Sequence, residues 1–169
     1  MHDDGRLSLE VWTLNASALQ PSDVLLYSPS SLYGKLIAIK TWHSISHVEV
    51  YVGANQSVAS RDKKGVGQYA ARLDGVQYVL RPNRPVDLAA GLAWFERDAK
   101  GQPYGWLDLL AFLGSTRDRK GMVCSPFATL FLRACGLPIF RDEPANKVAP
   151  CTFLYSEMLD DVTTSCASE

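Results

Sequence analysis

The sequence has few of the residues from which metal sites and disulfide frameworks are built. It contains 4 cysteines and 3 histidines among 169 residues, and no two cysteines form a C-x-x-C pair. This spacing does not fit a zinc site, and four scattered cysteines do not suggest a disulfide framework. We therefore expect no metal and no other cofactor, and each cysteine has to be judged by its own position.

The sequence also lacks a large net charge and a long apolar run. Its formal net charge is −1, which gives no electrostatic reason to expect a nucleic-acid partner. No apolar run approaches the length of a membrane span, so no integral membrane segment is expected. Residues 1–10 are acidic and lack the basic and apolar regions of a secretory signal. We expect a monomer that is cytoplasmic as synthesised, so any delivery out of the cell would need a signal-independent route.

What the chain does have is the composition and length of one globular domain, which we place at residues 1–169. Hydrophobic residues make up 47% and charged residues 21%, enough to form a core. Alternating or apolar runs predict strands at residues 7–14, 23–27, 47–52, 57–60 and 76–80. Helices are predicted at about 32–42, 87–98, 106–113, 125–135 and 152–159. Strands early and helices late indicate an α+β fold, with a small antiparallel sheet packed against helices.

Cys124 is the strongest candidate for chemistry. It stands two residues before Pro126, where a helix is predicted to begin. Unpaired N–H groups and the positive end of the helix dipole favour the thiolate, the nucleophilic form of the side chain. The same N–H groups can stabilise an oxyanion during acyl transfer. The alternative is an inert cysteine of the core, since cysteine is among the most buried residues.

The other cysteines have weaker positions. Cys135 lies at the opposite end of the same helix, where the dipole disfavours a thiolate, so a core role is expected. Cys151 follows a proline at another predicted helix start and is the second candidate nucleophile. Cys166 lies in a polar tail, where no role is expected.

His47 is the candidate base. It opens an alternating strand, so His47, Glu49 and Tyr51 share one face while the intervening valines face the other way. A histidine beside core-facing valines is held rigidly, as a catalytic base must be. The alternative is an ordinary histidine on a sheet surface.

A cysteine–histidine pair needs a third group to orient the imidazole, and two candidates are open. Glu49 lies two residues beyond His47 on the same face, and a carboxylate holds an imidazolium well. Ser60 lies on the neighbouring strand of the predicted hairpin, and cross-strand placement favours it. The sequence does not decide between the two.

Several segments together resemble the circularly permuted branch of the NlpC/P60 superfamily of papain-like cysteine peptidases. They cover most of the chain from Asp23 to Tyr155, and each motif is weak without the others. The matching segments are PSDVLLY (21–27), SHVEVYVG (46–53), GQPYGW (101–106), VCSPF (123–127) and APCTFLY (149–155). The histidine precedes the cysteine, which is the permuted order of the YiiX-like and lecithin-retinol-acyltransferase-like proteins.

The resemblance implies a papain-like fold and a role for each matching residue. Cys124 would be the nucleophile, His47 its base, and Tyr104 a residue lining the oxyanion site. Two positions depart from the family. Glu49 stands where the family usually has glycine or a small residue, and the third catalytic position, often histidine or glutamate, falls on Ser60 if the hairpin is aligned by its apolar residues.

Three functions follow as hypotheses. The first is a cysteine hydrolase that cleaves an amide bond, with peptides of the cell wall as the substrate class that the resemblance supplies. The second is an acyl hydrolase or acyltransferase on lipid-like chains, which would need an apolar groove lined by residues 32–42 and 106–113. The third is a binding module that keeps the fold, for which the serine at the third position leaves room. We rank them in this order.

Overall fold

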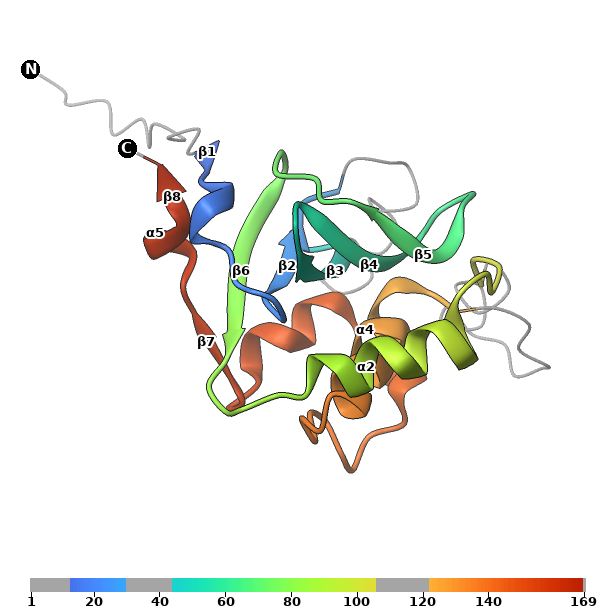
Figure 1. Cartoon of the computed structure of the whole chain (residues 1–169). Coiled ribbons are helices and arrows are strands. Elements are labelled where there is room, and N and C mark those ends of the chain that lie inside the picture. The colour runs from blue at the N-terminus through green and yellow to red at the C-terminus, as the bar shows by residue number, and fades with distance from the viewer. Residues whose placement is uncertain (1–12, 30–43, 106–121, 169) are drawn as a thin grey trace, which may run out of the picture.

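The structure is a computed structural model that describes residues 13–29, 44–105 and 122–168 (Figure 1). The helices predicted at 32–42 and 106–113, and all but the end of the strand predicted at 7–14, lie outside the described residues. The described part is an α+β arrangement in which helices cover one face of an open sheet (Figure 1).

The main sheet has six strands, all paired antiparallel, in the order β5-β4-β3-β2-β6-β7. A separate pair of short strands, β1 (Thr13–Leu14) and β8 (Ala167–Ser168), brings the two ends of the described chain together. The strands of the main sheet are β2 (Val24–Tyr27), β3 (His47–Gly53), β4 (Gln56–Arg61), β5 (Gly65–Ala70), β6 (Val76–Pro82) and β7 (Leu159–Asp161).

Two helices lie against the same face of this sheet, α2 (Leu88–Trp94) and α4 (Cys124–Ala134) (Figure 1). Asp87 caps α2, because its carboxylate accepts a hydrogen bond of 2.9 Å from the N–H of Ala90. The chain continues as a π-helical turn (Phe95–Ala99). The shorter helical elements are η1 (Ala16–Ala18), η3 (Ala145–Lys147), η4 (Pro150–Tyr155) and α5 (Thr163–Cys166).

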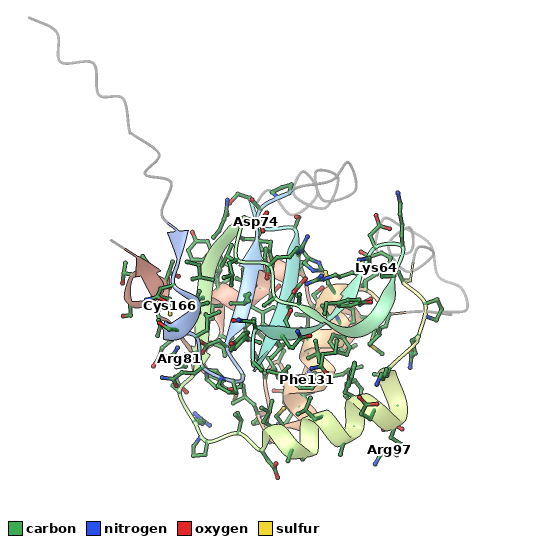
Figure 2. All side chains as sticks on the ribbon, turned by 45° about the horizontal axis from the view of Figure 1, so that its top comes forward. Lys64, Asp74, Arg81, Arg97, Phe131 and Cys166 are labelled. Atoms are coloured by element: carbon green, nitrogen blue, oxygen red, sulfur yellow. The ribbon has the colours of Figure 1, made fainter. Side chains whose placement is uncertain are left out.

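The main core fills the space between the sheet and α4. From the sheet it takes Val48 and Val50 of β3, and from the helix Phe127 and Phe131, all fully buried (Figure 2). Phe127 and Phe131 are one helical turn apart, so one face of α4 carries both aromatic rings into the core. Burying side chains of this size removes them from water at a gain of about 2 kcal/mol each. This packing fixes the start of α4 against β3.

Most of the predicted elements are confirmed. The strands at 23–27, 47–52, 57–60 and 76–80 correspond to β2, β3, β4 and β6, and the helices at 87–98 and 125–135 correspond to α2 with its π-helical turn and to α4. The helix predicted at 152–159 is wrong. Its first part is the 3-10 helix η4, and Leu159 belongs to β7, which pairs with β6. Pairing with a sheet edge overrides the local helical pattern there.

The β3–β4 hairpin contains a bulge that decides which side chains share a face. Ala54 and Asn55 form its turn, both with positive φ, and Gly53 pairs with Gln56. The register then shifts by one residue, so that Tyr51 pairs with Ser57. Because neighbouring residues of a strand point to opposite faces, this shift exchanges the side chains that β4 presents on the two faces of the sheet.

Candidate active site

Cys124 is the first residue of α4, and its side chain is buried, with 2% of the residue exposed. The residue before it, Val123, has extended backbone and provides no side-chain cap. The first turn of α4 therefore keeps N–H groups that no capping side chain uses, directly at the thiol. Pro126 in this turn costs nothing, because an N–H there would have no helical partner.

His47, the first residue of β3, lies close enough to Cys124 for the charge and hydrogen bonding of that side chain to raise the pKa of the imidazole. Its other contact is with Glu49, whose Oε1 is 3.0 Å from the Nε2 of His47. Since Nε2 faces the carboxylate, Nδ1 is the ring nitrogen left for the thiol. The imidazole is 17% exposed, so it is largely shielded from water. The imidazole of His47 is thus shared between the neighbourhood of the Cys124 thiol and the carboxylate of Glu49.

The surroundings of His47 favour its protonated form. Burial by itself lowers the pKa of the imidazole, but the charge and hydrogen bond of Cys124, followed by those of Glu49, raise it to about 9. An imidazolium between a sulfur and a carboxylate can donate a hydrogen bond to each. This is the protonation state required of a histidine that pairs with a cysteine thiolate.

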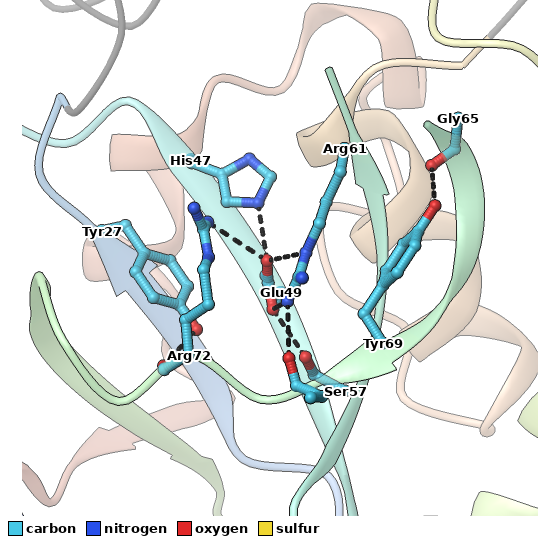
Figure 3. A network of polar contacts seen from close by, with 9 residues as sticks. Tyr27, His47, Glu49, Ser57, Arg61, Gly65, Tyr69 and Arg72 are labelled. Atoms are coloured by element: carbon cyan, nitrogen blue, oxygen red, sulfur yellow. Dashed lines mark hydrogen bonds and ion pairs between the residues drawn. The ribbon is translucent and has the colours of Figure 1, made fainter. Parts of the chain in front are cut away.

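Glu49 is fully buried and is held by four side chains (Figure 3). Arg61 donates from Nε to Oε1 and from Nη2 to Oε2, both at 2.8 Å. Ser57 donates to Oε2 at 2.5 Å, and Arg72 donates from Nη2 to Oε1 at 3.2 Å. With His47 as the fourth partner, both carboxylate oxygens are satisfied by donors.

These contacts keep Glu49 ionised despite its burial. Burial alone raises the pKa of the carboxyl, but hydrogen bonds from His47, Arg61 and Ser57 hold that pKa well below its usual range. An ionised carboxylate accepts from the imidazole and fixes the orientation of its ring. Glu49 is therefore the group that orients His47.

Ser60 does not take this position, contrary to the cross-strand placement that favoured it. Its hydroxyl donates to the carbonyl oxygen of Met122 instead. The reason is the hairpin bulge, because the register beyond it turns Ser57 and Arg61 toward the face of Glu49 and turns Ser60 toward the core. Ser60 thus anchors the chain two residues before Cys124.

Tyr104 is brought toward Cys124 by the segment that follows the π-helical turn. The carbonyl of Gln102 accepts from the N–H of Val66 at 2.8 Å, and the carbonyl of Pro103 accepts from the N–H of Met122 at 3.1 Å. Burial, then the negative charges of Cys124 and Asp62, raise the pKa of the Tyr104 hydroxyl well above its usual range. A neutral hydroxyl that feels the charge of the nucleophile is a suitable donor to an oxyanion.

The remaining cysteines lie apart from this site. Burial, together with the charge of Asp87, raises the pKa of the Cys135 thiol to about 12, so it stays protonated. Burial also raises the pKa of the Cys166 thiol. Cys151 is half-buried in the 3-10 helix η4. No disulfide joins any of the four.

Sequence reasoning missed three of the residues that hold the site. None of Ser57, Arg61 and Arg72 was predicted to hold the residue that orients His47. A strand position facing a glutamate is a weak signal, because it depends on the register of the hairpin. The placement of Glu49 on the same face as His47 was predicted, since both alternate with valines that face the core, but the burial of Glu49 was not.

Among the described residues, no group of three or more histidine, cysteine or acidic side chains is arranged to hold a metal ion. None of the helices that the structure describes has the length and apolar character needed to cross a membrane. No protein-family model matches the chain, and no curated protein matches it either. The chemistry of the site therefore rests on the geometry of its own residues.

Proposed function

We propose that this protein is a papain-like cysteine hydrolase of the permuted NlpC/P60 type, with Cys124 as nucleophile, His47 as base and acid, and Glu49 as the residue that orients His47. The observation that carries the proposal is the imidazole of His47, which lies 3.0 Å from the buried carboxylate of Glu49 and whose pKa is raised by Cys124 at the start of α4. A merely structural cysteine has no need of this arrangement.

The first half of the reaction forms an acyl-enzyme. The thiolate of Cys124 attacks the substrate carbonyl carbon, and the electron pair of the C=O bond moves to the oxygen. N–H groups at the start of α4 and the Tyr104 hydroxyl are suited to stabilise this oxyanion. When the intermediate collapses, the C–N bond breaks and His47 gives its proton to the leaving amine, which leaves a thioester on Cys124.

The second half restores the enzyme. His47, now neutral, takes a proton from a water molecule, and the resulting hydroxide attacks the thioester carbonyl. The C–S bond breaks, the acid product leaves, and Cys124 is again a thiolate beside an imidazolium. Glu49 keeps the imidazole in one orientation throughout and stabilises its charged form.

Cell-wall peptides are the proposed substrate class, and this choice rests on the sequence resemblance alone. A wall substrate also requires the signal-independent delivery expected from the sequence. The groove that the lipid hypothesis needs would involve residues 32–42 and 106–113, which lie outside the described residues. The binding-module hypothesis loses its main support, because it depended on a serine at the orienting position and Glu49 occupies that position.

The direct test is incubation of the protein with purified peptidoglycan stem peptides, followed by mass spectrometry of the products. We expect cleavage of one amide bond, with no cleavage by Cys124→Ala. Cys151→Ala is the matched control, since it removes the second candidate nucleophile and should leave cleavage unchanged. Products that are identical for the wild type and Cys124→Ala would refute the proposal.

A second measurement does not depend on the choice of substrate. A thiol held beside an imidazolium reacts with iodoacetamide at a pH where ordinary thiols are still protonated. We expect Cys124 to be alkylated under these conditions in the wild type and much more slowly in His47→Gln. A Cys124 with the pH profile of an ordinary free thiol would favour the binding module.

A further inference from the structure

Two arginines, Arg61 and Arg72, donate hydrogen bonds to the single carboxylate of Glu49. Arg61 is held on several sides by its neighbours. Arg61 is 15% exposed and binds both carboxylate oxygens of Glu49 at once. Its Nη2 also donates to the carbonyl of Ala70 at 2.9 Å, and its guanidinium lies 4.5 Å from the ring centroid of Tyr69. Arg61 is therefore locked in place as the counter-ion of Glu49.

Arg72 makes fewer hydrogen bonds than Arg61. It makes one bond to Glu49, of 3.2 Å, and its side chain is 38% exposed. Its Nε is one of two buried side-chain polar atoms that have no hydrogen-bond partner among the residues the structure describes. A guanidinium carries five N–H donors, so Arg72 retains unused capacity to bind an anion.

The position of Arg72 is fixed beside the base. Its guanidinium lies 4.8 Å from the ring centroid of Tyr27, and that ring lies 5.6 Å from the ring of His47. Arg72 and Arg61 reach Glu49 from opposite sides, with His47 between them (Figure 3). The partly exposed guanidinium is thus held next to the imidazole that takes part in the proposed reaction.

His47, Arg61 and Arg72 all bind the single carboxylate of Glu49, so three basic side chains share one acidic partner. Arg72 is the most exposed of the three. A partly desolvated cation of this kind gains most from a ligand that carries one negative charge.

We propose that Arg72 binds a carboxylate group of the substrate beside His47. This inference rests on the proposed function and narrows its substrate class to amides or esters that carry a free carboxylate near the scissile bond. The planar fork of the guanidinium suits the two oxygens of a carboxylate, and the Nε–H of Arg72 still lacks an acceptor among the described residues. Neutral lipid esters offer no such group and would bind more weakly.

Binding is tested in Cys124→Ala, which cannot hydrolyse anything. The probe is sodium acetate, titrated against sodium chloride at constant ionic strength, and the readout is the NMR signal of the His47 imidazole. We expect a saturable shift with acetate, weakened about tenfold or more by adding Arg72→Gln. Adding Arg97→Gln instead, at an exposed surface position, should change nothing. A curve that Arg72→Gln leaves unaltered, or tighter saturation by inorganic phosphate, overturns the inference.

A second test uses the wild-type protein, so its outcome does not depend on whether a variant folds. Iodoacetate and iodoacetamide are similar in size, but only iodoacetate carries a carboxylate. We expect Cys124 to favour iodoacetate over iodoacetamide by a rate ratio about tenfold higher than that of N-acetylcysteine. Equal ratios would contradict the carboxylate site. An iodoacetate preference without any peptide cleavage would instead remove the hydrolase proposal and leave the anion site standing.

Discussion

The guanidinium of Arg61 on β4 and the carboxylate of Glu49 on β3 form a two-pronged ion pair, with two N–H···O bonds of 2.8 Å. Lysine at this position keeps the charge but cannot span both oxygens. In Arg61→Lys we expect Cys124 alkylation and substrate turnover to fall by about ten- to a hundredfold, because a displaced carboxylate no longer holds His47 in place. We also expect the free energy of unfolding to fall by about 1–3 kcal/mol in urea denaturation.

The matched control for Arg61→Lys is Arg97→Lys. Arg97 also pairs with an acid, Asp98, but both side chains are exposed. Exposed ion pairs contribute little to stability, so this change should leave the free energy of unfolding close to that of the wild type. Similar losses in the two variants would mean that the burial of Glu49 has no special role.

The two candidates for the orienting residue differ in what their removal should do. Glu49→Gln removes the charge that faces His47 and leaves Arg61 without its counter-ion, so we expect turnover to fall by about a hundredfold or more. Ser60→Ala removes only the bond to the Met122 carbonyl and should reduce turnover less than about tenfold. Steady-state kinetics on both variants measures the difference. A larger effect of Ser60→Ala would return Ser60 to the orienting role.

The titration of His47 should appear in the stability of the whole protein. Burial lowers its pKa, but Cys124 and Glu49 raise it from 6.5 to about 9. A pKa that rises on folding adds stability that is complete below the unfolded pKa and is lost as the pH rises through the folded one. We therefore expect the free energy of unfolding to fall as the pH rises from 6.5 through about 9, by at most about 3 kcal/mol.

Urea unfolding at a series of pH values measures this loss, with His47→Gln as the comparison. The variant lacks the titrating group, so its stability should change much less over the same range of pH. Parallel curves for the two proteins would show that His47 does not carry a raised pKa.

The packing of α2 on α4 leaves no room for a side chain at Gly91. A Cβ added there would lie 2.2 Å from the Sγ of Cys135 and 3.3 Å from the Cζ of Phe131. Alanine favours helices over glycine by about 1 kcal/mol, yet we expect Gly91→Ala to destabilise the protein by about 1–3 kcal/mol through overpacking. Thermal or urea unfolding shows whether the free energy of unfolding of Gly91→Ala rises or falls relative to the wild type.

Removing the obstructing atom tests the cause. In the Gly91→Ala, Cys135→Ala double variant the added methyl group can use the space that the sulfur leaves. We expect a favourable coupling of about 1 kcal/mol or more between the two changes in a double-mutant cycle. Simple additivity would show that another contact causes the destabilisation.

Patterns within short stretches of the sequence predicted much of the fold. The alternation from His47 to Val52 and the apolar run ending at Tyr27 placed two central strands, and Asp87 marked the start of α2. Those patterns depend only on the period of the backbone and on capping, which short segments encode. The 3-10 helix η4 and the strand β7 were not predicted, and β7 forms because it pairs with β6, which is far away in sequence.

By itself, the sequence determined that a thiol stands at a helix start and that a histidine opens a strand with Glu49 on its face. Those facts follow from the order of residues and the strand period. Only the tertiary structure decided which side chain orients His47. One extra residue in the β3–β4 hairpin turns Ser57 and Arg61 toward Glu49 and Ser60 away from it, and a register shift of one residue leaves no trace in the pattern of apolar residues.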